Sequence, residues 1–296
     1  MSGAGIIGRG LKRKGIGGII IDVIMIFLAV CFIVPFLSVI ARSFSDEVSV
    51  LTASVGLWPI NFNTNAYRYA MLSTNYFRTF GNSVFITVVG TVVSLFLNCM
   101  CAFPMAHKDF RERNFLRYMF MFTMIFTAGL IPGYLVVRDL GLIDTYWALF
   151  LPGFIQPYNL LLIVGFLQGI PVAMDESARL DGASDFRIFL RIYLPMSKPV
   201  LATMTLFMAV GFWNDWYRPL IFLQSQNKFP LALYLKQVLQ SATEINKTLD
   251  STVYGGVAAE SVQDATIILS TIPILIVYPF VQKYFVTGLN LGAVKG

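Results

Sequence analysis

Side chains capable of catalysis or metal binding are sparse in this chain. Histidine occurs once, as His107, so neither a Ser/His/Asp set nor a histidine-based metal site can be assembled. We expect His107 to be an interfacial side chain. Cys31, Cys99 and Cys101 lie in apolar segments without metal-ligand spacing, which favours packing thiols. Lys247 is the only lysine followed by serine or threonine, and it lacks the preceding glycines of a nucleotide-binding loop. We therefore expect no catalytic residue, no metal site and no ATP hydrolysis in this chain.

A charged segment, residues 171–198, interrupts the apolar chain and has the most distinctive residue spacing. Its small and charged side chains are concentrated in one run: Glu176, Ser177, Ala178, Asp181, Gly182 and Ala183. Small residues allow the backbone of a partner to approach closely, and nearby arginines offer forked hydrogen-bond donors. We interpret the segment as a docking surface for a protein partner. The alternative is an amphipathic hairpin that rests on the bilayer surface.

Local signals predict that this segment forms two short helices joined by a turn. Pro171 suits the first position of the first helix, and Gly182 suits the left-handed residue that ends it. Ser184 can cap the second helix, which is expected to end at Pro195. The second helix has an apolar stripe at helical spacing, formed by Phe186, Phe189, Leu190 and Tyr193.

The sequence on either side of the charged segment indicates a membrane protein. The 296 residues are 56% hydrophobic and 13% charged, whereas soluble domains have about 25% charged residues. A transmembrane helix needs about 20 mostly apolar residues. We predict an all-α polytopic membrane protein, built as a single domain over residues 1–296. Its six predicted spans are about 18–41, 81–106, 116–137, 146–168, 199–223 and 266–287.

The distribution of basic residues orients the predicted spans. Most of the 22 lysines and arginines lie before span one, in the loops after spans two and four, and in the C-terminal segment. Cytoplasmic loops carry such an excess, so both termini and the charged segment are expected in the cytoplasm. The net charge of +6 is explained in this way, without nucleic-acid binding. The two long outer loops, 42–80 and 224–265, are expected to be either interfacial helices or plain surface loops.

Span five carries the best candidates for contact with a transported solute. Aromatic faces and a planar amide, the groups that bind sugars, occur together at Trp213, Asn214, Trp216 and Tyr217. The alternative is an aromatic belt at the membrane interface, combined with an ion pair between Asp215 and Arg218 one helical turn apart. Interhelical hydrogen bonding is the favoured interpretation for four weaker candidates, Asn82, Asn98, Gln156 and Asn159.

The charged segment resembles the "EAA" motif of ABC-importer permeases. That motif has Glu-Ala-Ala, an Asp-Gly pair three residues on, and an apolar helix that ends at proline. The corresponding residues here are Glu176-Ser177-Ala178, Asp181-Gly182-Ala183, Phe189, Ile192, Pro195 and Pro199. Ser177 departs from the family's alanine, a small-for-small change. Trp213-Asn214, the C-terminal residues 292–296 and the runs 133–142 and 194–203 are similar to the carbohydrate-uptake (maltose-system-like) branch and its complex-polysaccharide and oligosaccharide members.

The resemblance implies that the charged segment is a coupling helix between spans four and five, seated on a cytoplasmic ATPase dimer. Matching positions make Glu176, Ser177, Ala178, Asp181, Gly182 and Ala183 the docking element. They make Gly292, Lys295 and Gly296 an ATPase-contacting tail. The resemblance also implies a homologous permease subunit and an extracellular or periplasmic solute-binding protein. ATP and magnesium would be bound by the partner ATPase, with no cofactor in this chain.

We therefore predict a non-enzymatic permease subunit of an ABC importer, multi-pass in a bacterial cytoplasmic (inner) membrane. With a homologous subunit it would form the bilayer pathway for a saccharide, in particular an oligosaccharide. One alternative is a secondary active transporter, which usually needs ionisable groups near the membrane midplane that are almost absent here. The other is a non-transporting membrane scaffold, which gives no reason for the motif.

Overall fold

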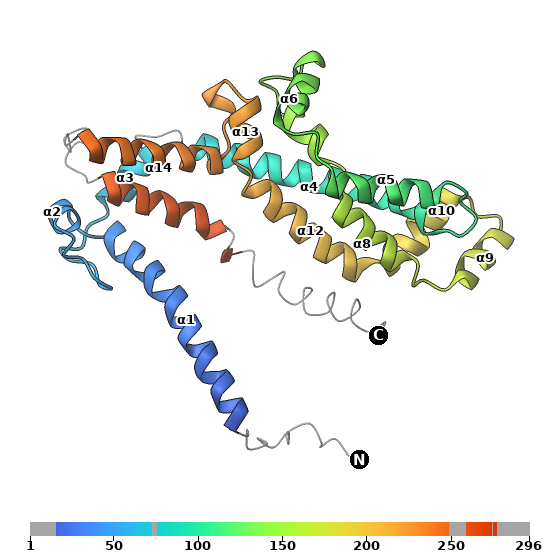
Figure 1. The fold of residues 1–296 in the computed structure, drawn as a ribbon, viewed down its shortest axis with the longest axis horizontal. Coiled ribbons are helices and arrows are strands. Elements are labelled where there is room, and N and C mark those ends of the chain that lie inside the picture. Colours follow the sequence, from blue (N-terminus) through green and yellow to red (C-terminus); the bar gives the residue numbers. More distant parts are fainter. Residues whose placement is uncertain (1–15, 73–75, 249–258, 274, 277–296) are drawn as a thin grey trace. The chain divides into compact units, whose positions relative to one another are not determined.

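The computed structural model describes residues 16–72, 76–248, 259–273 and 275–276. Every regular element within these residues is a helix (Figure 1). Packing divides the chain into two compact units, one comprising Met1–Tyr69 and Leu249–Ala265, the other Ala70–Thr248 and Thr266–Gly296. Three of the predicted ATPase-contacting residues, Gly292, Lys295 and Gly296, lie outside the described residues.

The first unit contains α1 (Ile16–Ser43) and α2 (Glu47–Leu51). The 28 residues of α1 are long enough to cross a bilayer, and its apolar side chains are largely exposed, as expected for a helix covered by lipid. At the end of α1, Arg42 donates from Nε to the buried Asp264 carboxylate over 2.9 Å. Polar contacts of this kind fasten the end of α1 within its own unit.

In the second unit the long helix α4 (Tyr76–Ala106) packs against α8 (Pro157–Leu167) and α12 (Lys198–Trp213). Their shared core includes fully buried Met105, Leu160 and Ile163. Helix α3 (Asn65–Leu72) begins in the first unit and ends in the second. The other helices of the second unit are α5 (Arg113–Ile125), α6 (Leu130–Asp139), α7 (Trp147–Phe150), α9 (Val172–Leu180), α10 (Asp185–Ile188), α11 (Leu194–Met196), α13 (Tyr217–Phe222) and α14 (Leu231–Thr248). Short 3-10 or π turns complete the set: η1 (Leu151–Gly153), η2 (Phe189–Tyr193) and η3 (Gln226–Lys228).

Side-chain amides connect segments of the second unit, as predicted for two of the asparagines. The buried Asn98 side chain donates to the carbonyl of Phe154 over 2.7 Å and accepts from the backbone N–H of Gln156. The half-buried Asn82 side chain donates to the carbonyls of Asn227 and Phe229. Such bonds fix helices and loops against each other.

Two described helices, α1 from Gly17 to Ser43 and α4, are each long and apolar enough to cross a membrane. Up to five spans result if each of three bent helix pairs is one span. The bends are 116° between α5 and α6, 45° between α7–η1 and α8, and 83° between α10–α11 and α12. Predicted spans 116–137 and 146–168 thus fall on bent helix pairs. Six spans and cytoplasmic termini remain a prediction.

Predicted span 199–223 is divided rather than a single helix, because α12 ends at Trp213 and α13 begins at Tyr217. The carboxylate of Asp215 accepts the backbone N–H of Arg218 over 3.2 Å, which satisfies one donor at the start of α13. Pro219 has no N–H with which to continue a helix from the preceding turn. These local interactions account for the restart.

Candidate functional site

The charged segment forms two helices joined by a tight turn, and the turn depends on glycine. Gly182 has φ +75°, the left-handed region predicted for it. Its N–H donates to the carbonyl of Arg179, and the Ala183 N–H donates to the carbonyl of Ala178. Pro171 lies just before the first residue of α9 rather than at that position. Ser184 precedes α10 with extended backbone, although its side chain makes no capping hydrogen bond.

The predicted docking residues divide into an outward and an inward set. Glu176, Ser177, Asp181 and Gly182 are exposed, whereas Ala178 and Ala183 are half-buried against the core of the second unit. Leu180, which sequence reasoning did not select, is 90% exposed beside the turn. In Figure 1, α9 and α10 lie at the right-hand end of the second unit.

The second half of the segment differs from the prediction. The helical run continues through α10, the π turn η2 and α11, so Pro195 lies inside the run and the break comes at Ser197. Pro195 follows directly on the π turn η2, where the α-helical hydrogen-bond pattern is already interrupted. Only two members of the predicted apolar stripe, Phe189 and Tyr193, are buried, whereas Phe186 and Leu190 are exposed. A π turn shifts the angular positions of side chains away from α-helical spacing.

A charged cluster that sequence reasoning missed connects α9 to the end of α4. Asp175 is the one buried residue of α9. Its Oδ2 lies 3.2 Å from Arg179 Nε and 3.4 Å from His107 Nε2. His107 is not a free interfacial side chain: it is 16% exposed and its ring lies 4.5 Å from that of Phe103. The hydrogen bond to Asp175 raises the pKa of Arg179 above its ordinary value.

The predicted solute-contacting residues lie together at the break between α12 and α13. Trp216 and Tyr217 are exposed and meet edge to face at 5.7 Å, and Asn214 is exposed beside them. Trp213 is half-buried, with its ring 5.9 Å from Phe80. Lys236 of α14 places Nζ 5.1 Å from the Trp216 ring, a cation–π contact. Three of the four candidates are therefore accessible.

The predicted pair between Asp215 and Arg218 is present and is structural. Arg218 donates from Nε to the Asp215 carboxylate and from Nη1 to the carbonyl of Leu149 over 3.0 Å. Its guanidinium carbon lies 5.4 Å from the Phe212 ring. These contacts hold the start of α13 against α7. The pair is therefore committed to packing and separate from the exposed aromatic residues.

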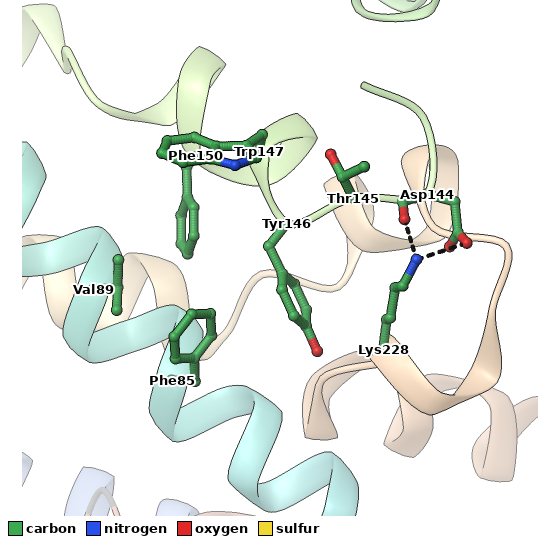
Figure 2. Close-up of a pocket in the computed structure, with 8 residues that line it drawn as sticks. All are labelled: Phe85, Val89, Asp144, Thr145, Tyr146, Trp147, Phe150 and Lys228. Carbon is green, nitrogen blue, oxygen red and sulfur yellow. Dashed lines mark hydrogen bonds and ion pairs between the residues drawn. The ribbon is translucent and has the colours of Figure 1, made fainter. Parts of the chain in front are cut away.

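Figure 2 shows a cavity of about 350 Å³ in the second unit. Aromatic and apolar side chains from α4 and from residues 145–150 form its walls, and the Tyr146 ring lies between Phe85 and Lys228. At the rim, Lys228 Nζ contacts the backbone carbonyl of Asp144 and, at 2.9 Å, its carboxylate. Hydrogen bonds from Ser225, and then from Lys228, hold the pKa of Asp144 well below its usual range. The cavity thus offers aromatic faces and a neutralised ion pair.

Comparison with known proteins identifies the class of protein to which these features belong. Residues 90–291 match the family described as "Binding-protein-dependent transport system inner membrane component". Protein LplC of Bacillus subtilis (strain 168) is 44% identical over 265 residues, 89% of this chain and 90% of that protein. The polygalacturonan/rhamnogalacturonan transport system permease protein YtcP of the same organism is 38% identical over 287 residues, 97% of this chain and 100% of that protein.

A solved structure gives the same result at the level of fold. The structure described as a bacterial ABC transporter involved in the import of the acidic polysaccharide alginate matches with a TM-score of 0.83 and 32% identity. The match covers 91% of this chain and 96% of that one. This chain belongs to the family of binding-protein-dependent transport system inner membrane components. The predicted resemblance to ABC-importer permeases is confirmed, and the protein is a membrane transport component rather than an enzyme.

Proposed function

We propose that this chain is one of two permease subunits of an ATP-driven importer in a bacterial cytoplasmic membrane. With a homologous subunit it forms the pathway for an oligosaccharide that an external solute-binding protein delivers. The observation that carries the proposal is the full-length similarity to a polygalacturonan/rhamnogalacturonan transport permease. The fold similarity to an alginate importer supports it. ATP and magnesium are bound by separate ATPase subunits in this proposal.

Helix α9 and the turn after it are the proposed contact with the ATPase. The argument rests on the exposed set Glu176, Ser177, Asp181 and Gly182, together with Leu180. An apolar anchor surrounded by polar groups is the usual composition of a protein docking site. The half-buried Ala178 and Ala183 join this surface to the core. Closure of the ATPase dimer then moves the element as a rigid body and switches the permease between inward- and outward-facing forms.

The solute path is proposed to pass the break between α12 and α13. Trp216, Tyr217 and Asn214 are exposed there, and aromatic rings next to an amide suit the apolar faces and hydroxyls of a sugar. The alternative remains an aromatic belt at the membrane interface. Replacing Trp216 by alanine is expected to lower saccharide uptake while the importer still assembles. Unchanged uptake would favour the belt.

Transport by the reconstituted importer tests the proposed function against both alternatives. Vesicles that contain this chain, its partner subunits and the binding protein are loaded with ATP or, separately, given an ion gradient without ATP. An importer takes up the oligosaccharide only with ATP. A secondary active transporter takes it up only with the gradient, and a scaffold gives no uptake under either condition.

A further inference from the structure

The one buried side chain of α9 is a carboxylate whose interactions are incomplete. Oδ1 of Asp175 is buried and makes no hydrogen bond. Oδ2 is held by Arg179, one turn further along the same helix, over 3.2 Å. Arg179 is also paired with Asp185 over 2.7 Å. A buried carboxylate with an open acceptor is costly unless a second donor approaches it.

His107, the first residue after α4, approaches this carboxylate from another element. Its Nδ1 lies 2.8 Å from the carbonyl of Phe103. A carbonyl oxygen only accepts hydrogen bonds, so Nδ1 carries a proton in this arrangement. The ring is held between Phe103 and Tyr193, whose centroids lie 4.5 and 5.2 Å away. The other ring nitrogen, Nε2, is buried, makes no hydrogen bond, and lies 3.4 Å from Oδ2 of Asp175.

We propose that His107 and Asp175 form the link through which movement of α9 reaches the helix bundle. The two side chains face each other across a gap slightly longer than a hydrogen bond. A small inward movement of α9 closes this gap, and His107 then donates from Nε2 to the carboxylate. Because His107 directly follows α4, which packs on α8 and α12, force applied at α9 enters the bundle at this point. This inference rests on the proposed coupling role of α9. His107 acts in it as a positioning residue.

Protonation decides whether the link can close. With its proton on Nδ1, a neutral imidazole presents a lone pair at Nε2 and repels the carboxylate, whereas the imidazolium donates to it. Asp175 of α9, with its partner Arg179, and Tyr193 of η2 are the charged and titratable groups beside the ring. Lys108 is the next residue in the chain, and Arg117 of α5 binds the carbonyl of Met105, two residues before His107. The link therefore closes only when both ring nitrogens of His107 carry a proton.

Three variants of the complete reconstituted importer test the link. His107→Phe keeps an aromatic ring against Phe103 and Tyr193 but removes the donor. His107→Gln keeps an N–H that does not titrate. Asp185→Asn is the matched control, because it removes a carboxylate that also binds Arg179 but contacts no residue of α4 in the described interactions. The quantity measured is oligosaccharide imported per ATP hydrolysed.

His107→Phe is expected to lose about tenfold in coupling relative to the wild type, the effect of one charge-assisted hydrogen bond. His107→Gln is expected to restore most of this coupling, and Asp185→Asn to match the wild type. Coupling by His107→Phe equal to wild type, or coupling by His107→Gln as low as that of His107→Phe, would overturn the link. Failure of the wild type to import with ATP would instead refute the proposed function.

Discussion

Substitutions of Gly182 can distinguish two effects at the proposed docking surface: strain in the backbone of the turn, and steric exclusion of the ATPase by a large side chain. Its φ of +75° lies in the left-handed region, which costs a residue with a Cβ atom about 1–2 kcal/mol. A Cβ built at this position meets no other atom within 4 Å. An alanine here therefore carries the backbone cost without a clash inside the permease.

Two substitutions share that strain and differ in what they present to a partner. Gly182→Ala is expected to lower the free energy of unfolding by about 1 kcal/mol and to retain ATPase binding. Gly182→Trp is expected to have a similar effect on stability, with an indole that extends from the exposed turn into the space an ATPase subunit would occupy. Gly182→Asn, whose side chain tolerates left-handed backbone, is expected to be the least destabilised.

Thermal unfolding of the purified permease measures the strain, and co-purification with the ATPase subunits measures docking. Imported solute per ATP hydrolysed then measures coupling. The reasoning predicts that Ala and Trp variants unfold at similar temperatures while only Trp loses ATPase binding and coupled import. If the Trp variant binds the ATPase and imports solute as well as the Ala variant, the turn after α9 is not the docking surface.

Two further predictions concern the polar contacts that hold the second unit together. In Asp144→Asn the new residue tolerates the φ of +58° at this position, but the charge that binds Ser225 and Lys228 is removed. The free energy of unfolding at pH 7 is therefore expected to fall by about 1–3 kcal/mol. The folded-state pKa of Asp144 is lowered, so this stabilisation is present above the usual aspartate pKa and is lost as pH falls through the folded-state pKa. Wild type and variant should therefore unfold at temperatures that converge in acid. Equal unfolding temperatures at pH 7 would contradict a stabilising role for the Asp144 carboxylate. Gly153→Ala would place a Cβ 2.1 Å from Nη1 of Arg218, displacing the guanidinium from the Leu149 carbonyl at a cost of about 1–3 kcal/mol. The control Gly165→Ala, where a Cβ meets nothing within 4 Å, should be neutral or slightly stabilising, and equal unfolding temperatures of the two alanine variants would rule out the packing role of Arg218.

The docking turn is an example of a feature that local sequence predicts well. Gly182 is in the left-handed conformation expected for it, since the end of a helix is decided by the few residues around it. The amide of Asn98 was also expected to bond between helices, because an apolar segment leaves few other partners. The helix boundary at Pro195 was wrong, because proline is disfavoured only where its missing N–H would be needed. At Pro195 the preceding π turn already interrupts the regular α-helical hydrogen bonds.

By itself the sequence determined the all-helical class, the apolar segments and the motif that identifies the permease family, since each depends on composition or on residues close in the chain. Tertiary structure alone decided which side chains of the motif face outward, that Leu180 is exposed, and that Arg218 packs instead of lining a path. It also brought His107 to Asp175, 68 residues away in the chain. Such pairings depend on how α4, α8 and α12 pack, and packing between distant segments leaves no periodic signal in a single sequence.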